Sequence, residues 1–101
     1  MSKIIEFLYR DGGNYKWNFR AKISDKKFKK LEKKHGKLEL NTELSYKKDL
    51  GISRENFHLE RGYPYDSEID HDLIDVQNIL TDDEIEIEAV SFYIDCDENT
   101  N

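Results

Sequence analysis

Apolar and polar residues alternate strictly near the start of the chain. In the stretch 15–23, apolar side chains occupy every second position (Tyr15, Trp17, Phe19, Ala21 and Ile23), with basic or amide residues between them. This period of two predicts a half-buried β-strand. Residues 4–10 alternate in the same way, and the turn signal Asp-Gly-Gly-Asn at 11–14 separates the two runs. Residues 4–23 are therefore predicted to form a β-hairpin.

The length of the hairpin loop decides which aromatic residues face each other. A two-residue loop would place the aromatic residues of the two arms on opposite faces of the sheet. A loop of three or five residues instead pairs Tyr9 with Trp17 and Phe7 with Phe19, and gathers both aromatic rows on one face. We expect the odd-length loop.

A helix is predicted next, over residues 24–35. Ser24 or Asp25 is suited to cap its start, and Phe28, Leu31 and His35 follow at helical spacing. Gly36 is expected to end the helix in the left-handed conformation. Lysines cover the rest of the circumference, which suits a helix packed by a narrow stripe on one side of a sheet.

The second half of the chain has weaker patterns. Residues 38–62 show no clear period, so we expect irregular structure. The alternatives within it are a short strand at 38–40, a helical turn at 46–50 ended by Gly51, and a further capped turn at 53–57. Residues 69–80 fit both helix and strand, and their β-branched residues favour a strand. Residues 85–94 predict a last strand with a bulge where the alternation changes phase.

These elements predict one α+β domain over residues 1–95, followed by a frayed acidic tail at 96–101. The expected architecture has two layers: an antiparallel sheet of three to five strands, with the N-terminal hairpin, and one Lys-rich helix packed on it. The core is expected to be small and largely aromatic (Tyr9, Trp17, Phe19, Phe28, Leu31 and Phe92).

Composition indicates the cellular compartment and the kind of genome that we expect for this protein. The chain has 101 residues and one cysteine, Cys96, so it forms no internal disulfide. No apolar run approaches the length needed to span a bilayer, and the N-terminus lacks the apolar region of a signal peptide. We expect a cytoplasmic protein without membrane contact. Frequent Lys, Ile and Asn and scarce Ala indicate an A/T-rich genome, such as that of a low-GC bacterium or its phage.

Charge is distributed very unevenly along the chain. The net charge is −6, but residues 1–37 hold twelve Lys or Arg against four Asp or Glu, a balance of +8. Residues 38–101 hold four against eighteen, a balance of −14. Such asymmetry fits a nucleic-acid patch, an acidic tail, or two halves that neutralise each other in the fold.

No motif for catalysis or metal binding emerges. The alternating acids of residues 66–72 resemble the start of a calcium loop, but His71 and Gln77 stand where that loop requires Gly and Glu. The three histidines (His35, His58 and His71) and Cys96 show no zinc spacing. We predict no catalytic residue, metal or cofactor. A small enzyme remains an alternative that would need a pocket uniting His58 or His71 with carboxylates.

Part of the hairpin sequence resembles that of other small proteins. Tyr9-Arg10-Asp11 followed by Asn14-Tyr15-Lys16 resembles the opening of a group of small uncharacterised bacterial proteins, which also carry an Asp-His pair before an acidic C-terminal segment. The corresponding pair here is Asp70-His71, although the aromatic and His residues that often follow it are replaced by Asp72-Leu73-Ile74. The resemblance covers about a third of the chain and implies no function.

The leading hypothesis is a non-enzymatic protein-binding module that uses its acidic half. Ordered carboxylates beside aromatic rings suit the basic surface of a protein partner. The candidate contact residues, whose carboxylates should lie exposed and close together, are Tyr63, Tyr65, Asp66, Glu68, Asp70 and Asp72. Size and composition suggest an inhibitor or accessory protein of phage or mobile-element origin. The alternative is nucleic-acid binding through lysines of the 24–35 helix (Lys26, Lys27, Lys30, Lys33 and Lys34).

Overall fold

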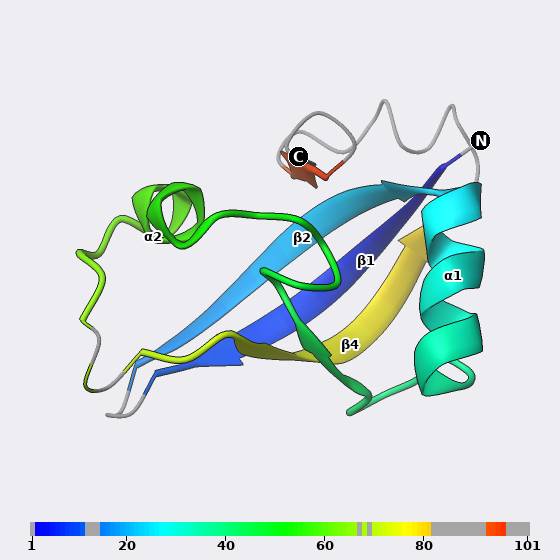
Figure 1. Ribbon diagram of the computed structural model, residues 1–101, viewed down its shortest axis with the longest axis horizontal. Helices are drawn as coiled ribbons and strands as arrows, with labels where there is room; N and C mark the ends of the chain where they lie inside the picture. Colours follow the sequence, from blue (N-terminus) through cyan, green and yellow to red (C-terminus); the bar gives the residue numbers. More distant parts are fainter. Residues whose placement is uncertain (1, 12–14, 67, 69, 82–92, 97–101) are drawn as a thin grey trace.

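A five-stranded sheet forms the centre of the computed structural model, which describes residues 2–11, 15–66, 68, 70–81 and 93–96 (Figure 1). The strand order is β3-β4-β1-β2-β5, so the two hairpin arms occupy the middle. The strands are β1 (Ser2–Arg10), β2 (Lys16–Ser24), β3 (Glu43–Ser45), β4 (Leu73–Thr81) and β5 (Ile94–Asp95). The predicted α+β fold with its N-terminal hairpin is confirmed.

The hairpin has the predicted register. Tyr9 pairs with Trp17 and Phe7 with Phe19, so the loop between the paired ends of β1 and β2 has the odd length that the aromatic rows require. The rings of Phe7 and Phe19 stack with their centroids 5.5 Å apart. Ile4, on the opposite face of β1, is fully buried as well. The hairpin is therefore covered on both faces at this point.

The ambiguous segment after residue 69 forms strand β4, which pairs antiparallel with β1 and β3. The expectation of a wholly antiparallel sheet is wrong at one edge, because β5 pairs parallel with β2 through Ala21 and Ile94. Most of the last predicted strand, including its bulge and Phe92, lies outside the described residues.

Helix α1 (Asp25–His35) begins where the sequence predicts. The Ser24 Oγ accepts a hydrogen bond from the Lys27 N–H at 3.2 Å. Gly36 follows the helix with φ 83° and ψ −168°, so it is not the left-handed cap that we expected. This positive-φ, extended conformation is accessible essentially to glycine alone, and it turns the chain sharply out of the helix.

The second helix, α2 (Arg54–Arg61), is longer than the single capped turn at 53–57 that we considered within an otherwise irregular stretch. Ser53 caps it, accepting a hydrogen bond from the Asn56 N–H at 3.2 Å, and Gly62 ends it in the left-handed conformation. Its buried residues are Phe57, His58 and Arg61. Because two of these are polar, the helix has no apolar period to recognise. The alternative strand at 38–40 is also wrong, since the strand here is β3.

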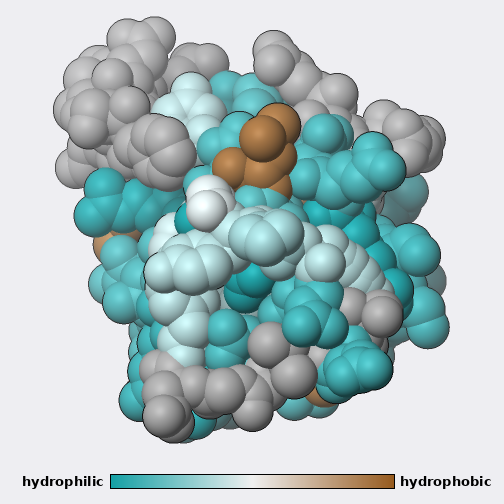
Figure 2. All heavy atoms as spheres, turned by 90° about the vertical axis from the view of Figure 1, so that its left-hand side faces the viewer, coloured by the Kyte–Doolittle hydropathy of each residue, from teal (hydrophilic) through white to brown (hydrophobic). Residues whose placement is uncertain are grey.

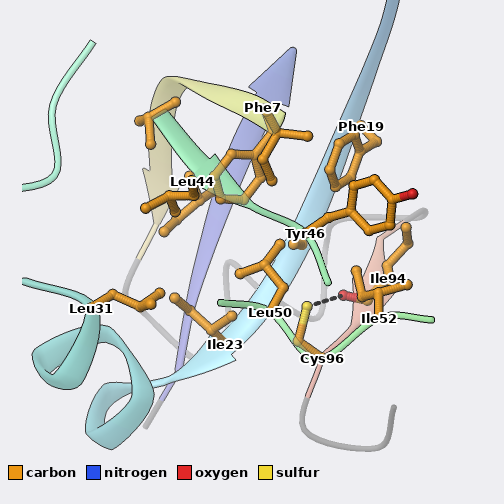
Figure 3. Packing of buried hydrophobic residues seen from close by; sticks show 14 of the residues in the cluster. Phe7, Phe19, Ile23, Leu31, Leu44, Tyr46, Leu50, Ile52, Ile94 and Cys96 are labelled. Atoms are coloured by element: carbon orange, nitrogen blue, oxygen red, sulfur yellow. Dashed lines mark hydrogen bonds between the residues drawn. The ribbon is translucent and has the colours of Figure 1, made fainter. Parts of the chain in front are cut away.

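The core lies on one face of the sheet, beneath α1 at one end, α2 at the other, and the connecting chain between them (Figures 1 and 3). Tyr9, Phe19, Phe28 and Leu31 are buried as predicted, whereas Trp17 is only partly buried against this cluster. Cys96 is also buried, and its N–H donates to the Lys22 carbonyl at 3.0 Å. The packed part of the chain therefore includes Cys96, which we had assigned to the tail.

Candidate functional site

A buried ion pair joins the end of α2 to the chain that precedes β4. The side chains of Arg61 and Asp70 are each only 2% exposed, and Arg61 Nη2 lies 3.3 Å from Asp70 Oδ2. The same carboxylate accepts hydrogen bonds from the Tyr9 hydroxyl at 3.1 Å and the Asp66 N–H at 2.8 Å. Although burial acts to raise it, the pKa of Asp70 is lowered by the Asp66 N–H, the Arg61 charge and the Tyr9 hydroxyl. Asp70 is therefore a buried anion that fixes three separate segments.

Three tyrosine rings enclose the guanidinium of Arg61. Its central carbon lies 5.1 Å from the ring centroid of Tyr9, 5.4 Å from that of Tyr15 and 5.3 Å from that of Tyr63. Tyr15 and Tyr63 also contact each other, with centroids 4.3 Å apart. Burial, followed by the charge of Asp70, raises the pKa of Tyr9 to about 12. The cation–π contacts hold the loop after α2 against the hairpin.

His58 lies in the interior beside this pair. Its side chain is 3% exposed, Nδ1 is 4.0 Å from Asp70 Oδ2, and Nε2 is 3.5 Å from the Tyr46 hydroxyl. Burial and the positive charge of Arg61 lower the pKa of His58. The ring stacks on Tyr65, with centroids 5.2 Å apart. Both nitrogens of His58 thus face interior groups, which suits a structural role better than proton transfer to a ligand.

A second, more exposed pair fixes the start of α2. Arg54 Nε donates to Asp72 Oδ1 at 3.0 Å, and its guanidinium also donates to the Tyr65 hydroxyl. The hydrogen bond and charge of Asp72 raise the pKa of Arg54. The two arginines of α2 therefore hold both ends of the loop that carries Tyr63 and Tyr65.

An apolar groove lies on the outer side of α2. It has a volume of about 440 Å³. We call it the α2 groove, and its lining consists of Glu55, His58, Leu59, Gly62, Tyr63, Pro64 and Tyr65. Leu59 is 77% exposed and Tyr63 is 49% exposed, so two large side chains with apolar surface are open to solvent at this groove. Figure 2 views the molecule from this side and shows a hydrophobic patch beside residues of intermediate hydropathy.

The predicted protein-binding residues separate into two groups. Tyr63 and Tyr65 line the α2 groove, and Asp66 and Glu68 are exposed beyond it. The expectation of four exposed carboxylates is wrong for Asp70, which is buried against Arg61. It is wrong in part for Asp72, whose side chain is 20% exposed and paired with Arg54. The sequence showed alternating acids, but it did not show that two of them meet arginines of α2.

Not all of the predicted lysines of α1 lie at the same place on the surface. Lys26, Lys27, Lys30 and Lys34 line a basic groove beside α1, whereas Lys33 does not. Lys47 and Lys48 contribute to the same region from the loop after β3. Sequence reasoning missed these two residues, because only the fold brings that loop against the helix. Within the described residues, no three His, Cys, Asp or Glu side chains gather as a metal site.

Comparisons with protein-family models, with curated proteins and with solved structures find no match to this chain. Among the residues that the structure describes, no helix has the length and apolar character needed to cross a membrane.

Proposed function

We propose that this chain is a non-enzymatic protein-binding module, and that the α2 groove is its contact site. The observation that carries the proposal is a pair of exposed side chains, Leu59 and Tyr63, that line one groove. Interior contacts of Arg54 and Arg61 hold the loop that forms this groove. A single exposed leucine is ordinary on protein surfaces. An exposed leucine, two tyrosines and a proline around one concavity have the composition of an interface core.

The interior contacts support a preorganised site. Arg61 stacks against Tyr63 and pairs with Asp70, while Arg54 binds both Asp72 and the Tyr65 hydroxyl. Side chains already held in place lose less conformational entropy when a partner binds. This frame therefore favours recognition by the rings of Tyr63 and Tyr65 without rearrangement of the loop.

The charges near the groove indicate the chemistry of the partner. Glu55 lines the groove, and the exposed Asp66 and Glu68 follow Tyr65 along the chain. A matching protein segment would insert an apolar side chain beside Leu59 and present Lys or Arg to these acids, which would also speed association. Binding itself would then be the activity, as in an inhibitor or accessory protein.

Capture with matched baits tests this proposal. Wild type, Leu59→Gln and Leu40→Gln are immobilised separately and exposed to an extract of the source organism, and retained proteins are quantified by mass spectrometry. Leu40 is a suitable control because it is 63% exposed and lies outside the α2 groove. Burying one leucine contributes about 1.5–3 kcal/mol, so Leu59→Gln should weaken a true partner about tenfold or more.

The expected result is a protein retained by wild type and by Leu40→Gln but lost with Leu59→Gln. Retention of the same proteins by all three baits, or of none by wild type, would contradict the proposal. Both leucines are exposed, so neither change should move the urea midpoint of unfolding appreciably, and this is checked first.

A further inference from the structure

A second groove, rich in lysine, lies between α1 and the loop after β3. It consists of two adjoining cavities of about 490 Å³ and 380 Å³, which share Lys27, Lys48 and Asp49. We call it the lysine groove. Its cationic lining comes from four residues of α1 and two of the loop: Lys26, Lys27, Lys30, Lys34, Lys47 and Lys48.

The one carboxylate in the lysine groove is already engaged. Asp49 Oδ1 lies 2.8 Å from Lys34 Nζ and 3.1 Å from His35 Nε2, and Oδ2 accepts from the Ser45 N–H at 2.8 Å. Although burial opposes it, these hydrogen bonds lower the pKa of Asp49. The carboxylate side chain is only 4% exposed, and it faces Lys34 and His35 rather than the rest of the groove.

The other lysines of the groove fall into two classes. Lys27 Nζ donates to the Leu50 carbonyl at 2.8 Å and so holds α1 to the loop. In the described part of the chain, by contrast, no carboxylate lies within ion-pairing distance of the four remaining ammonium groups, those of Lys26, Lys30, Lys47 and Lys48. Like charges gathered around one concavity repel each other, and a bound polyanion would relieve that repulsion.

The shape and lining of the lysine groove indicate which polyanion fits. The two cavities together are much larger than one phosphate group, and their apolar lining is confined to Leu31 and Ile52, with no aromatic ring. Point-like ammonium groups bind phosphates, whereas base recognition needs stacking or planar donors. A flexible phosphodiester strand can follow a concave groove and present successive phosphates to its lysines.

We propose that the lysine groove binds the backbone of single-stranded nucleic acid without base preference. The site is distinct from the sequence-based alternative, because it excludes Lys33 and adds Lys47 and Lys48. It is also separate from the α2 groove, since the two linings share no residue and α1 lies at the opposite end of the molecule from α2 (Figure 1). Because the whole chain has a net charge of −6, nucleic acid is expected to contact the protein only at the lysine groove.

Fluorescence anisotropy with labelled 12-nucleotide dT and rU strands tests the proposal between 50 and 200 mM salt. Single-strand affinity falls with salt at a slope of about −0.7 per phosphate contact, so four free lysines predict a slope of about −3. The groove variant is Lys30→Gln/Lys48→Gln. The control, Lys33→Gln/Lys37→Gln, makes the same charge change at exposed positions outside the groove.

We expect micromolar binding by wild type, by the control and by Leu59→Gln, and at least tenfold weaker binding with a shallower slope for the groove variant. Equal weakening by the groove variant and the control would overturn the proposal, as would absence of binding at 50 mM salt. Tighter binding of a duplex of the same length, or full competition by tripolyphosphate at equal phosphate concentration, would overturn the single-strand assignment.

Discussion

Asp70→Asn removes the charge of a buried carboxylate and should greatly lower the free energy of unfolding, although the side chain hardly changes in size. In Asp70→Asn the side chain keeps one oxygen for the Tyr9 hydroxyl or the Asp66 N–H, which are 3.1 and 2.8 Å from the carboxylate in the wild type, but not for both. The new amide donors would also face Arg61, whose side chain is 2% exposed. Arg61 would then keep only the longer contact of its Nη1 with Asp11 Oδ2, at 3.9 Å.

The expected loss follows from that buried charge. Breaking a buried pair by removing one partner costs about 3–5 kcal/mol, whereas exposed pairs contribute only about 0–1 kcal/mol. Asp72→Asn, which removes the more exposed partner of Arg54, is therefore the matched control. A total stability of about 5–15 kcal/mol makes the first loss a large fraction of the whole.

Urea unfolding followed by the fluorescence of Trp17, the one tryptophan in the chain, measures both variants. Asp70→Asn should lower the unfolding free energy by about 3 kcal/mol or more, and Asp72→Asn by less than about 1 kcal/mol. The double variant Arg61→Met/Asp70→Asn should lose less than the sum of its single changes, because each removes the same interaction. A loss below about 1 kcal/mol for Asp70→Asn would refute the role given to this pair.

Four further results are expected. Because the pKa of His58 is lowered in the fold, the unfolded chain takes up an extra proton as the pH falls through about 6.5. The free energy of unfolding should therefore drop by up to about 1.4 kcal/mol per pH unit. His58→Gln should flatten this dependence in urea titrations between pH 7.5 and 5. A further loss begins below about pH 4, because the unfolded chain takes up protons at Asp49 and Asp70, whose pKa values are lowered in the fold; an unchanged midpoint at pH 3 would contradict this. Phe57→Ala should cost about 3–5 kcal/mol by chemical denaturation, because its fully buried ring stacks on Tyr46 at 3.8 Å and contacts Trp17. Neutralising the exposed acids in Asp66→Asn/Glu68→Gln should change stability by less than about 0.5 kcal/mol, and a larger loss would show that they are structural.

The hairpin and α1 could be predicted because their information is local. Alternation determines which side of a strand is buried, so the aromatic positions of β1 and β2 were enough to predict how the two strands pair. Ser24 and the stripe of Phe28 and Leu31 likewise define α1 without reference to the rest of the chain. The fold class followed from these elements.

Helix α2 shows why only Tyr63 and Tyr65 of the groove lining could be predicted. It exposes Leu59 and buries Arg61, which reverses the usual assignment of apolar residues to the interior. That reversal is possible only because Asp70 and three tyrosine rings surround the guanidinium, and Tyr9 lies 61 residues from Asp70 in the sequence. The partners of the acids at 70 and 72 were therefore hidden from any local pattern, as was the position of Lys47 and Lys48 beside α1.

The most direct test of the α2 groove maps where a captured protein touches this chain. Amide chemical shifts of the labelled protein are recorded while the unlabelled partner is added. The largest changes should fall on residues 55–65, where Leu59, Tyr63 and Tyr65 line the groove, and should disappear with Leu59→Gln. Changes centred on α1 or the sheet, with residues 55–65 unaffected, would contradict the claim that this groove is the binding site.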